Sequence, residues 1–590
     1  MNNEAVKAKR GPTGKGAKIL VNILITVVVA LVYFYAAVPA INLQSGDFYA
    51  FLLLTCLVYI VCAIVTSGFD TKRKLTFKDY IHFVKAQCLP IGILLAAIIV
   101  VGVIGEVVSL PIFRASAYRE LLVPEDGDFT TDVAQISFGE IPTLDRDSAN
   151  YLGDRQMGTL SDMVSQFEYS NDSTQINYQG RPVRVAPIAY ADIIKWFTNR
   201  STGLPAYVVV DMVTQEASVV RLQEGMKYSF SEPLNRNVMR HLRFQYPTMM
   251  FSTAEFEIDE NGHPWWIAPR IVKTIGLFGG TDIKGAVLMD AVTGECTYYD
   301  AEDVPTWVDN LYTSELIMEQ YDYHGTLIHG FINSIFGQKD VKQTTDGYNY
   351  IAMNDDVYMY TGITSANADQ SNLGFVLCNM RTKETSYYTA PGATEYAAMA
   401  SAQGVVQDLN YTATFPILLN IAGEPTYFIP LKDATSLVKM YAMVNVAQYQ
   451  LVATGTTVTA TEEEYIRLLS DRGITIPDAL PQTSVSGVIA ELRSAVLDGN
   501  TYYFIRLEDE DIFYSVSAME NNVAVILNVG DTVTIEHAAD EGDSLILNGY
   551  TVTLDKKADG EAIPSQAPVI ELPEESSAPE ESAPVESAQP

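Results

Sequence analysis

The hydrophobic positions of the first 113 residues form three long runs with almost no charge. Residues 19–46 and 48–69 contain no charged side chain, and a third run from Ala86 to Phe113 contains a single acid, Glu106. About 20 consecutive apolar residues cross the hydrocarbon core of a bilayer as a helix. The pattern therefore predicts three transmembrane helices, at about residues 19–41, 48–69 and 88–112.

The first run follows a basic segment, as the apolar part of a secretory signal peptide does. The apolar region of a signal peptide has about 7–15 residues, and this run is longer. Two further runs follow shortly after it. We therefore expect an uncleaved span rather than a cleaved leader.

The basic residues predict the orientation of the spans. The N-terminal tail (residues 1–18) and the 70–85 loop are rich in Lys and Arg, and such loops stay in the cytoplasm. The short 42–47 connection carries Asp47 alone and is expected outside. Three spans then place everything after about residue 113 outside the cytoplasm. Glu106 lies in the last third of the third run, where it either reaches the outer interface or marks an ion path or helix contact.

Composition separates this anchor from the rest of the chain. The 590 residues carry a net charge of −34 and are nonetheless 48% hydrophobic, which excludes wholesale disorder. Residues 1–88 carry +6, so the remainder carries −40. An acidic surface repels phosphate, and nucleic-acid binding is therefore not expected.

Beyond residue 113, short strand-like runs are separated by two recurring turn signatures. Gly-x-Pro-x4-Pro begins at Gly180, Gly262 and Gly423. Asp or Asn, followed by Thr and Glu three and five positions later, begins at Asp211, Asp290 and Asn379. Asp, Asn and Gly favour tight turns between antiparallel strands. Residues 114–460 are therefore expected to form tandem α+β repeats, each with two hairpins and a helix. The candidate helices are Ala189–Asn199, Leu234–Arg243, Val304–Leu311 and Thr394–Ala402.

One copy of the second signature resembles a known family. Gly-Ala-Val-Leu-Met-Asp290-Ala-Val-Thr-Gly294-Glu295 looks like the closing strand and turn of PepSY-type domains, which occur in secreted or membrane-tethered bacterial proteins. The resemblance covers about a dozen residues in each copy. The other copies replace the turn glycine with Gln215 and Lys383, and no functional residue is carried over.

The C-terminal part changes character again. Residues 461–482 are expected to form a short helix and a linker, and five short strands within 483–554 predict a small OB-like β-barrel. Its acidic run Glu508–Asp511 favours protein docking over nucleic-acid binding. Residues 555–590, rich in Pro, Glu, Ser and Ala, are expected to be a disordered acidic tail.

Signatures of catalytic or metal chemistry are weak throughout. Ser436 and Lys439 match Ser-x-x-Lys without its companion motifs, and His324 and His329 do not have the spacing of a zinc-binding helix. The turns Asp126–Asp128 and Asp259–Gly262 fit solvated β-turns better than calcium loops. We therefore assign no catalytic, cofactor-binding or metal residue. Pairing of Cys296 with Cys378 is left open.

Two further features, a set of aromatic residues and one charged segment, have alternative interpretations. The aromatic residues are expected in a β core rather than on sugar-binding shelves: Trp265, Trp266, Tyr321, Tyr323, Tyr358 and Tyr360. The charged segment 144–155 fits either a salt-bridged connector or a docking surface.

These observations predict a membrane-anchored α+β protein of the cell envelope with a large extracytoplasmic region. Its expected function is binding or scaffolding, and its partners are the lipid bilayer, other envelope or membrane proteins, or a cell-surface polymer. One alternative is an envelope hydrolase or transferase with an acidic site assembled across the repeats. Another is an accessory subunit of a membrane transport complex. A deep pocket with convergent acids of shifted pKa would favour catalysis, and a flat surface would favour scaffolding.

Overall fold

The computed structural model describes residues 15–68, 77–133, 141–353, 355–365 and 371–472 and, with short gaps, 482–557. The chain divides into two compact units, Met1–Pro477 and Asp478–Pro590. Most of the predicted N-terminal tail (1–18) and of the predicted disordered tail (555–590) lies outside the described residues.

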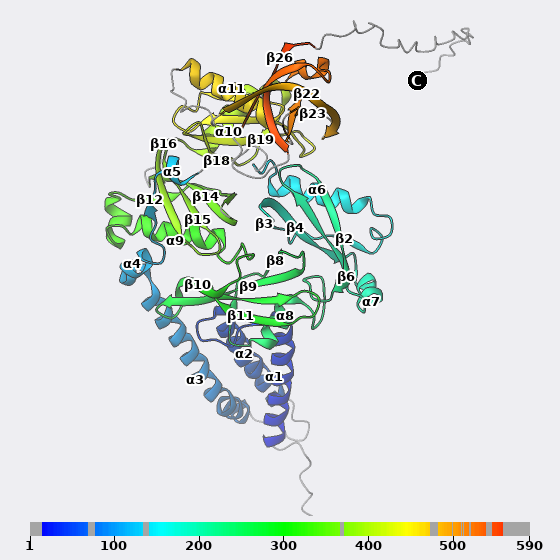
Figure 1. Cartoon of the computed structure of the whole chain (residues 1–590). Helices are drawn as coiled ribbons and strands as arrows, with labels where there is room; N and C mark the ends of the chain where they lie inside the picture. Colours follow the sequence, from blue (N-terminus) through cyan, green and yellow to red (C-terminus); the bar gives the residue numbers. More distant parts are fainter. Residues whose placement is uncertain are drawn as a thin grey trace, which may run out of the picture. The chain divides into compact units, whose positions relative to one another are not determined.

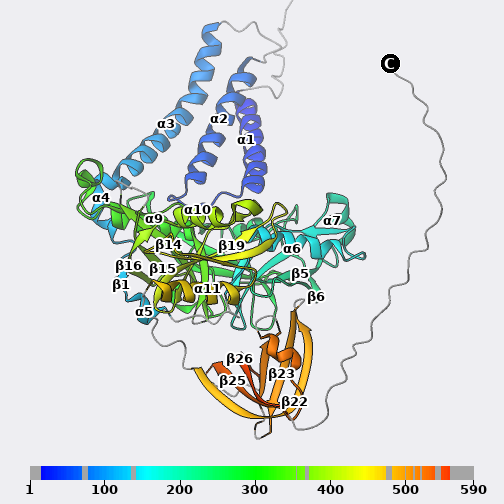
Figure 2. The ribbon, with the colours of Figure 1, turned by 90° about the horizontal axis from the view of Figure 1, so that it is seen from above.

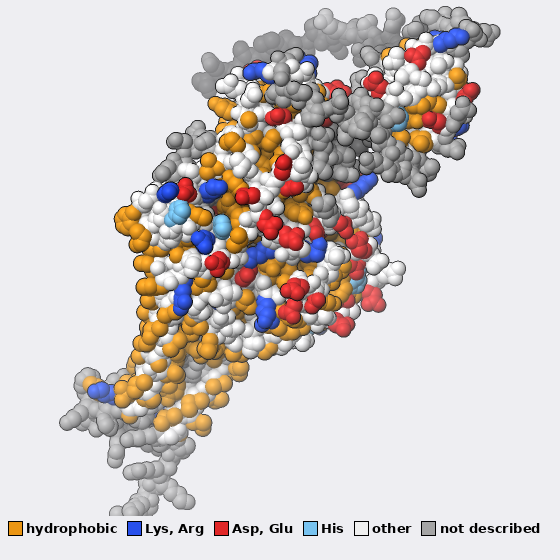
Figure 3. Space-filling view, turned by 60° about the vertical axis from the view of Figure 1, so that its left-hand side comes forward, with side chains coloured by type: hydrophobic (Ala, Val, Ile, Leu, Met, Phe, Trp, Pro, Cys, Tyr) orange, Lys and Arg blue, Asp and Glu red, His pale blue; other side chains and the backbone are white. Residues whose placement is uncertain are grey.

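Three long apolar helices form the N-terminal part of the first unit: α1 (Lys15–Ala37), α2 (Gly46–Gly68) and α3 (Phe77–Ser109). Each contains a stretch long and apolar enough to cross a membrane, namely Gly16–Ala37, Gly46–Ser67 and Val84–Ser109. Hydrophobic side chains cover the visible face of the helices in Figure 3, whereas acidic ones gather over the β-rich part. The third helix begins earlier than predicted, because the charged residues 77–85 extend it instead of forming a loop.

A buried polar cluster joins the three helices. The Asn22 amide nitrogen donates to the Gln87 side-chain oxygen at 3.0 Å, and the Thr66 hydroxyl donates to the Asn22 oxygen at 2.9 Å. Such hydrogen bonds between helices are a recurrent source of association inside membranes.

The β-rich part caps one end of this bundle. Arg240 and Arg243 donate through their Nε atoms to the carbonyls of Tyr35 and Val38, each at 2.9 Å. The Ser109 hydroxyl accepts from the main-chain N–H groups of residues 277 and 278, at 3.0 Å each. The ends of α1 and α3 and the 38–45 connection therefore meet the same body, as Figures 1 and 2 show.

Four β-sheets follow in the chain. Sheet 1 consists of β2 (Phe167–Tyr169), β3 (Thr174–Tyr178), β4 (Arg181–Tyr190), β5 (Leu204–Asp211) and β6 (Ala217–Met226). Sheet 2 consists of β7 (Met250–Phe251), β8 (Glu255–Ile258), β9 (Pro264–Ile275), β10 (Gly279–Asp290) and β11 (Cys296–Asp300). Sheet 3 consists of β12 (Lys342–Thr344), β13 (Asn349–Met353), β14 (Asp356–Ser365), β15 (Ser371–Asn379) and β16 (Thr385–Ala393), with β1 (Glu125–Asp126) parallel to β16. Sheet 4 consists of β17 (Thr412–Ala413), β18 (Ile417–Ile421), β19 (Glu424–Lys432), β20 (Val438–Asn445) and β21 (Val452–Gly455).

All four sheets share one antiparallel pairing order. In each, the first two strands both pair with the third, the third pairs with the fourth, and the fourth pairs with the fifth. Figure 1 shows the sheets arranged around a common centre. There β3 contacts β8 and β13, and β13 contacts β18. The arrangement resembles a four-bladed β-propeller.

The turn between the fourth and fifth strands repeats in detail. The Asp211 carboxylate accepts from the N–H groups two and three residues on, at 2.8 and 2.9 Å. Asp290 and Asn379 accept in the same way, and Asn445 accepts from the N–H of Gln448. The turn between the second and third strands also recurs in sheets 1, 2 and 4. There Gly180, Gly262 and Gly423 have φ of 76°, 75° and 78°. A positive φ costs glycine little, which explains its place there.

Helices precede or follow the sheets: α6 (Arg146–Gly158), α8 (Val238–Gln245), α9 (Ser314–Thr326), α10 (Glu395–Val405) and α11 (Val458–Asp471). Shorter helices are α4 (Pro111–Arg119), α5 (Phe129–Asp132) and α7 (Ile193–Asn199).

Several helix predictions need correction. Residues 304–311 are not helical, and the helix begins after Thr313, whose hydroxyl caps it. Residues 189–190 belong to β4, so α7 starts only after the cap Asp192. In the charged segment 144–155, for which a connector or a docking surface was expected, Asp145 is the N-cap of α6 and residues 146–155 are helical. Helix α11 begins after Thr457 rather than at Thr461.

The sheets pack their aromatic residues largely inward. Trp266 and Tyr360 are fully buried, and Tyr321 is nearly so, as expected for core residues. Phe256 and Trp266 lie edge to face with ring centroids 5.3 Å apart. Trp265, Tyr323 and Tyr358 are partly buried.

Among the described residues of the second unit there are five strands: β22 (Gln482–Leu497), β23 (Asn500–Leu507), β24 (Phe513–Ser517), β25 (Thr532–Ala538) and β26 (Ile546–Lys556). They pair in the order β22-β23-β24-β26-β25, and β25 pairs back with β22. All five predicted strands are present, with β22 much longer than expected. The assignment to the OB class stays a prediction.

Candidate functional site: a central cavity

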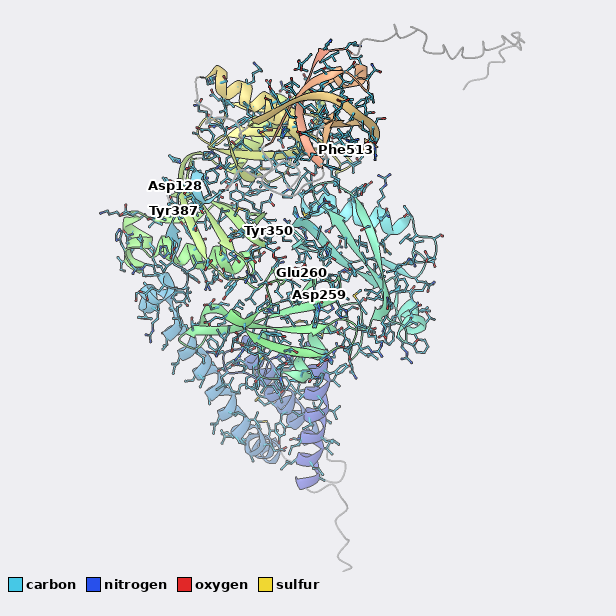
Figure 4. The ribbon with its side chains drawn as sticks, viewed as in Figure 1. Asp128, Asp259, Glu260, Tyr350, Tyr387 and Phe513 are labelled. Atoms are coloured by element: carbon cyan, nitrogen blue, oxygen red, sulfur yellow. The ribbon has the colours of Figure 1, made fainter. Side chains whose placement is uncertain are left out.

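A cavity of about 330 Å³ lies where the four sheets converge. Its wall includes Arg184 of sheet 1, Glu255 of sheet 2, Tyr350 of sheet 3 and Phe415 from the loop between β17 and β18 of sheet 4. Figure 4 shows Tyr350 near the centre, with Asp259 and Glu260 in the β8–β9 turn below it. A volume of this size accommodates a small polar solute or the end of a polymer.

Arg184 is the one buried cation in this wall. It lies in β4 opposite Gln175 of β3, between the apolar residues Val183 and Val185. Its Nη1 donates to the carbonyl oxygen of Ser173 at 3.1 Å, and its Nη2 approaches the Gln175 oxygen at 3.5 Å. Its Nε has no hydrogen-bond partner, and no described carboxylate lies within ion-pair distance. Burial lowers the pKa of the guanidinium. A guanidinium remains charged in proteins, and here it is buried without a direct ion pair to any described carboxylate.

Glu255 in β8 is a second under-compensated charge. Its carboxylate accepts from the Thr174 hydroxyl at 3.2 Å, and no described Lys or Arg forms an ion pair with it. Burial raises the pKa of this carboxyl above its ordinary value. Glu315, in the first turn of α9, adds another acid to the wall and accepts from the Tyr348 hydroxyl at 2.9 Å.

Aromatic side chains form the part of the wall that belongs to sheet 3. The rings of Tyr348 and Tyr350 meet edge to face, 5.6 Å between centroids. The Ser314 hydroxyl donates to the Tyr350 oxygen at 3.1 Å, which fixes that ring. Amphipathic rings of this kind suit contact with a hydrated ligand.

A fully buried carboxylate supports the cavity from outside its wall. Glu257 of β8 accepts from the N–H groups of Asp309 and Asn310 at 3.0 and 2.9 Å, and from the Asn310 amide at 3.0 Å. Asp309 in turn accepts from the N–H of Asn177 in β3 at 2.7 Å. Burial and the nearby Glu255 raise the pKa of Glu257 to about 7. Burial and the nearby Glu257 raise the pKa of Asp309 well above its ordinary value. This cluster ties sheet 1 to sheet 2.

An ion pair joins the start of α6, which packs on β5 and β6 of sheet 1, to the last sheet. Lys432 of β19 lies 2.6 Å from the carboxylate of Asp145, which also caps α6 through the N–H of Ser148. Burial opposes ionisation of Asp145, but the bonds from Lys432 and Ser148 hold its pKa below the ordinary value. The contact helps to close the ring of sheets.

Of the segments singled out in the sequence, the charged segment 144–155 contributes Leu144, Asp145, Arg146 and Asp147 to the cavity wall. The Ser-x-x-Lys match and the two histidines lie elsewhere. Ser436 occupies a turn with φ of 63°, and Lys439 pairs with Asp433 at 3.9 Å. His324 contacts the Arg119 carbonyl, whereas His329 contacts Asp340.

The acidic side chains of the two turns make local hydrogen bonds, and the cysteines are unpaired. Asp128 caps α5, and Asp259 accepts from N–H groups of its own turn. Cys296 and Cys378 are free thiols. Over the described ranges no group of three or more His, Cys, Asp or Glu side chains could hold a metal ion.

Outside the segment 144–155, the cavity residues were missed in the sequence, although a signal for some of them exists. Arg184 interrupts an otherwise apolar strand, and Glu255 and Glu257 alternate with Phe256 and Ile258. Burial of a charged side chain costs free energy unless the charge is paired. A charged residue within a strand that is otherwise apolar therefore indicates a partner or a ligand.

Comparisons with known proteins add little. No protein-family model and no curated protein matches the chain. Among solved structures, an exo-β-1,3-galactanase from Clostridium thermocellum is similar at 9% identity, over 68% of this chain and 74% of that one, with a TM-score of 0.19. A likeness this low carries no argument about fold or function.

Proposed function

We propose that this protein is a membrane-anchored, extracytoplasmic binding protein of the cell envelope, with the central cavity as its ligand site. The observation that carries the proposal is the pair Arg184 and Glu255. Arg184 is buried and Glu255 is partly buried, and the two side chains ionise with opposite sign and line the same cavity. Neither forms an ion pair with another described residue. Buried charges are costly unless they are compensated, and a polar ligand would supply the compensation.

The orientation is part of the proposal. The ends of α1 and α3 next to the β-rich part are poor in basic residues, whereas the opposite ends adjoin the basic tail and the 70–85 loop. Basic loops remain in the cytoplasm, so the sheets face outward. A reporter enzyme active only in the cytoplasm, fused after residue 120, should be inactive. Activity there would place the sheets inside.

Ligand capture tests the binding function. Full-length protein in nanodiscs would be incubated with a small-molecule extract of the envelope and examined by native mass spectrometry. We expect a bound species of low mass that is lost in Arg184→Met. Absence of any retained ligand, or equal retention by the variant, would contradict the proposal. Ser218→Ala, on the outer strand of sheet 1, is the matched control.

We further propose that the four sheets are copies of one module and that the second unit is an OB-like barrel. Identical pairing orders and the recurring Asp/Asn turn support the first statement. The strand order of the barrel, with β24 parallel to β26, supports the second. The PepSY-type resemblance of the hairpins applies to this module. The barrel and the outer strands would then contact other envelope proteins or a cell-surface polymer.

A hydrolase or transferase is the second candidate. Glu255 and Glu315 line the same cavity, and the raised pKa of Glu255 suits a general acid. Turnover of an envelope polymer that Glu255→Gln abolishes, with binding intact, would favour it.

An accessory role in transport is a third candidate. Glu106 is exposed one turn from the end of α3, where it meets either the interface or a partner helix. Loss of a membrane complex in Glu106→Leu, but not in Glu106→Gln, would favour this role.

A further inference from the structure

A short helix on sheet 1 exposes three large hydrophobic side chains. Ile193, Ile194 and Phe197 of α7 are 61, 68 and 60% exposed. Trp196, on the opposite face, is buried, and its indole N–H donates to Glu232. The helix is thus fixed to the body by one face and leaves an apolar face uncovered by the described chain.

A chain of contacts leads from α7 to the end of the first span. The Arg236 guanidinium donates to the carbonyl of Arg200, the C-cap of α7, at 2.6 Å. The adjacent Asn235 accepts from the Tyr35 hydroxyl at 2.8 Å, and Tyr35 belongs to the last turn of α1. The arginine and asparagine therefore bridge α7 and α1 directly.

The apolar surface continues along this bridge. Leu234 and Phe244 are 50 and 54% exposed, and the Phe244 ring lies 6.1 Å from that of Phe34 in α1. We call Ile193, Ile194, Phe197, Leu234 and Phe244 the α7–α8 surface. Figures 1 and 2 both place α7 at the edge of the β-rich part that faces the three helices.

We propose that the α7–α8 surface lies in the headgroup layer of the same bilayer that α1–α3 cross. Continuity with Phe34 and Tyr35 identifies the lipid as its occupant, because aromatic residues at the end of a span mark the membrane interface. Lys195, Arg200 and Arg236 border the apolar side chains, and basic residues around an apolar face are typical of interfacial helices. The surface gives the extracytoplasmic part a second attachment, which limits its tilt relative to the spans.

Photolabelling from lipid tests this contact. The full chain would be placed in phosphatidylcholine nanodiscs containing a phospholipid with a photoreactive group just below its headgroup. We expect labelling of the peptides that cover residues 193–200 to exceed several-fold that around Val164, which is equally apolar and 47% exposed. Equal labelling at the two positions would overturn the proposal.

Variants separate a lipid contact from contact with another protein. Ile194→Asp with Phe197→Asp should lower labelling throughout 193–200, whereas Val164→Asp should leave it unchanged. An unaltered unfolding midpoint would show that the variant is folded. If a bifunctional protein cross-linker joins α7 of two copies while lipid labelling is absent, the surface is an oligomer interface and the proposal is wrong.

Discussion

Two buried charges on facing sheets have opposite surroundings. Glu257 of β8 receives three hydrogen bonds from a loop that it holds in place. Arg184 of β4 has weaker acceptors, an unpartnered Nε and no ion pair within the described chain. Burial of a charge therefore does not by itself indicate function. The fold supplies hydrogen bonds to Glu257, whereas a bound ligand would supply them to Arg184 under the function proposed above.

Among these substitutions, removal of the Glu257 carboxylate should lower the free energy of unfolding the most. Glu257→Ala leaves two buried N–H groups without an acceptor, and each costs about 1–3 kcal/mol. We expect the free energy of unfolding to fall by about 2–6 kcal/mol in denaturant titrations followed by tryptophan fluorescence. Glu257→Gln keeps one acceptor oxygen and should lose less. An Ala variant as stable as the wild type would contradict the supporting role.

The pH dependence of stability should follow the same carboxyl. Folding raises the pKa of Glu257 from an ordinary 4.5 to about 7. Between these values the native carboxyl keeps a proton that the unfolded one has lost, so stability falls as pH rises through this window.

Thermal unfolding of the full chain at pH 5 and pH 8 measures this dependence. We expect a higher midpoint at pH 5, and a smaller difference between the two pH values in Glu257→Gln. A wild-type midpoint that rises with pH would show that other groups dominate. Asp309, whose pKa is also raised, acts in the same direction.

Arg184→Met should show the converse pattern. Replacing an uncompensated buried charge with an apolar side chain costs little stability, and we expect a change within about 1 kcal/mol. Ligand affinity, measured by calorimetry with the species captured from the extract, should fall at least about tenfold because a charge-assisted contact is lost. An Arg184→Met variant that unfolds readily and still binds the ligand would mean that Arg184 stabilises the fold and does not bind the ligand.

The smallest effect is expected at the outer turns. Asp211→Ala removes the acceptor for two N–H groups that are close to solvent, which should cost about 1 kcal/mol. Asp211→Asn should be nearly neutral, because Asn379 makes the same bonds in sheet 3. Denaturant midpoints would measure both. An Asn variant as unstable as the Ala variant would mean that the charge matters and the acceptor does not.

Local features of this fold could be predicted from the sequence. The three spans follow from runs of apolar residues, and the hairpins at Asp211, Asp290 and Asn379 follow from side chains that bond within their own turn. The five barrel strands were likewise found from turn and strand composition. In each case the interacting groups are near neighbours in the chain.

The cavity could not be predicted in this way. Its wall joins Asp145, Arg184, Glu255, Tyr350 and Phe415, whose meeting depends on how four sheets pack. The incorrect helix at 304–311 has a related cause, because Asp309 and Asn310 are held as a loop by Glu257, which lies 52 and 53 residues earlier in the chain. Contacts between residues far apart in the chain produce no periodic pattern in the local sequence.

An experimental map of the full chain after exposure to the envelope extract tests ligand binding in the cavity directly. We expect density for a small molecule in the cavity between the sheets, within hydrogen-bonding distance of the Arg184 guanidinium. An empty cavity in protein that retains a ligand, or a ligand bound at the barrel or the outer strands, would contradict it.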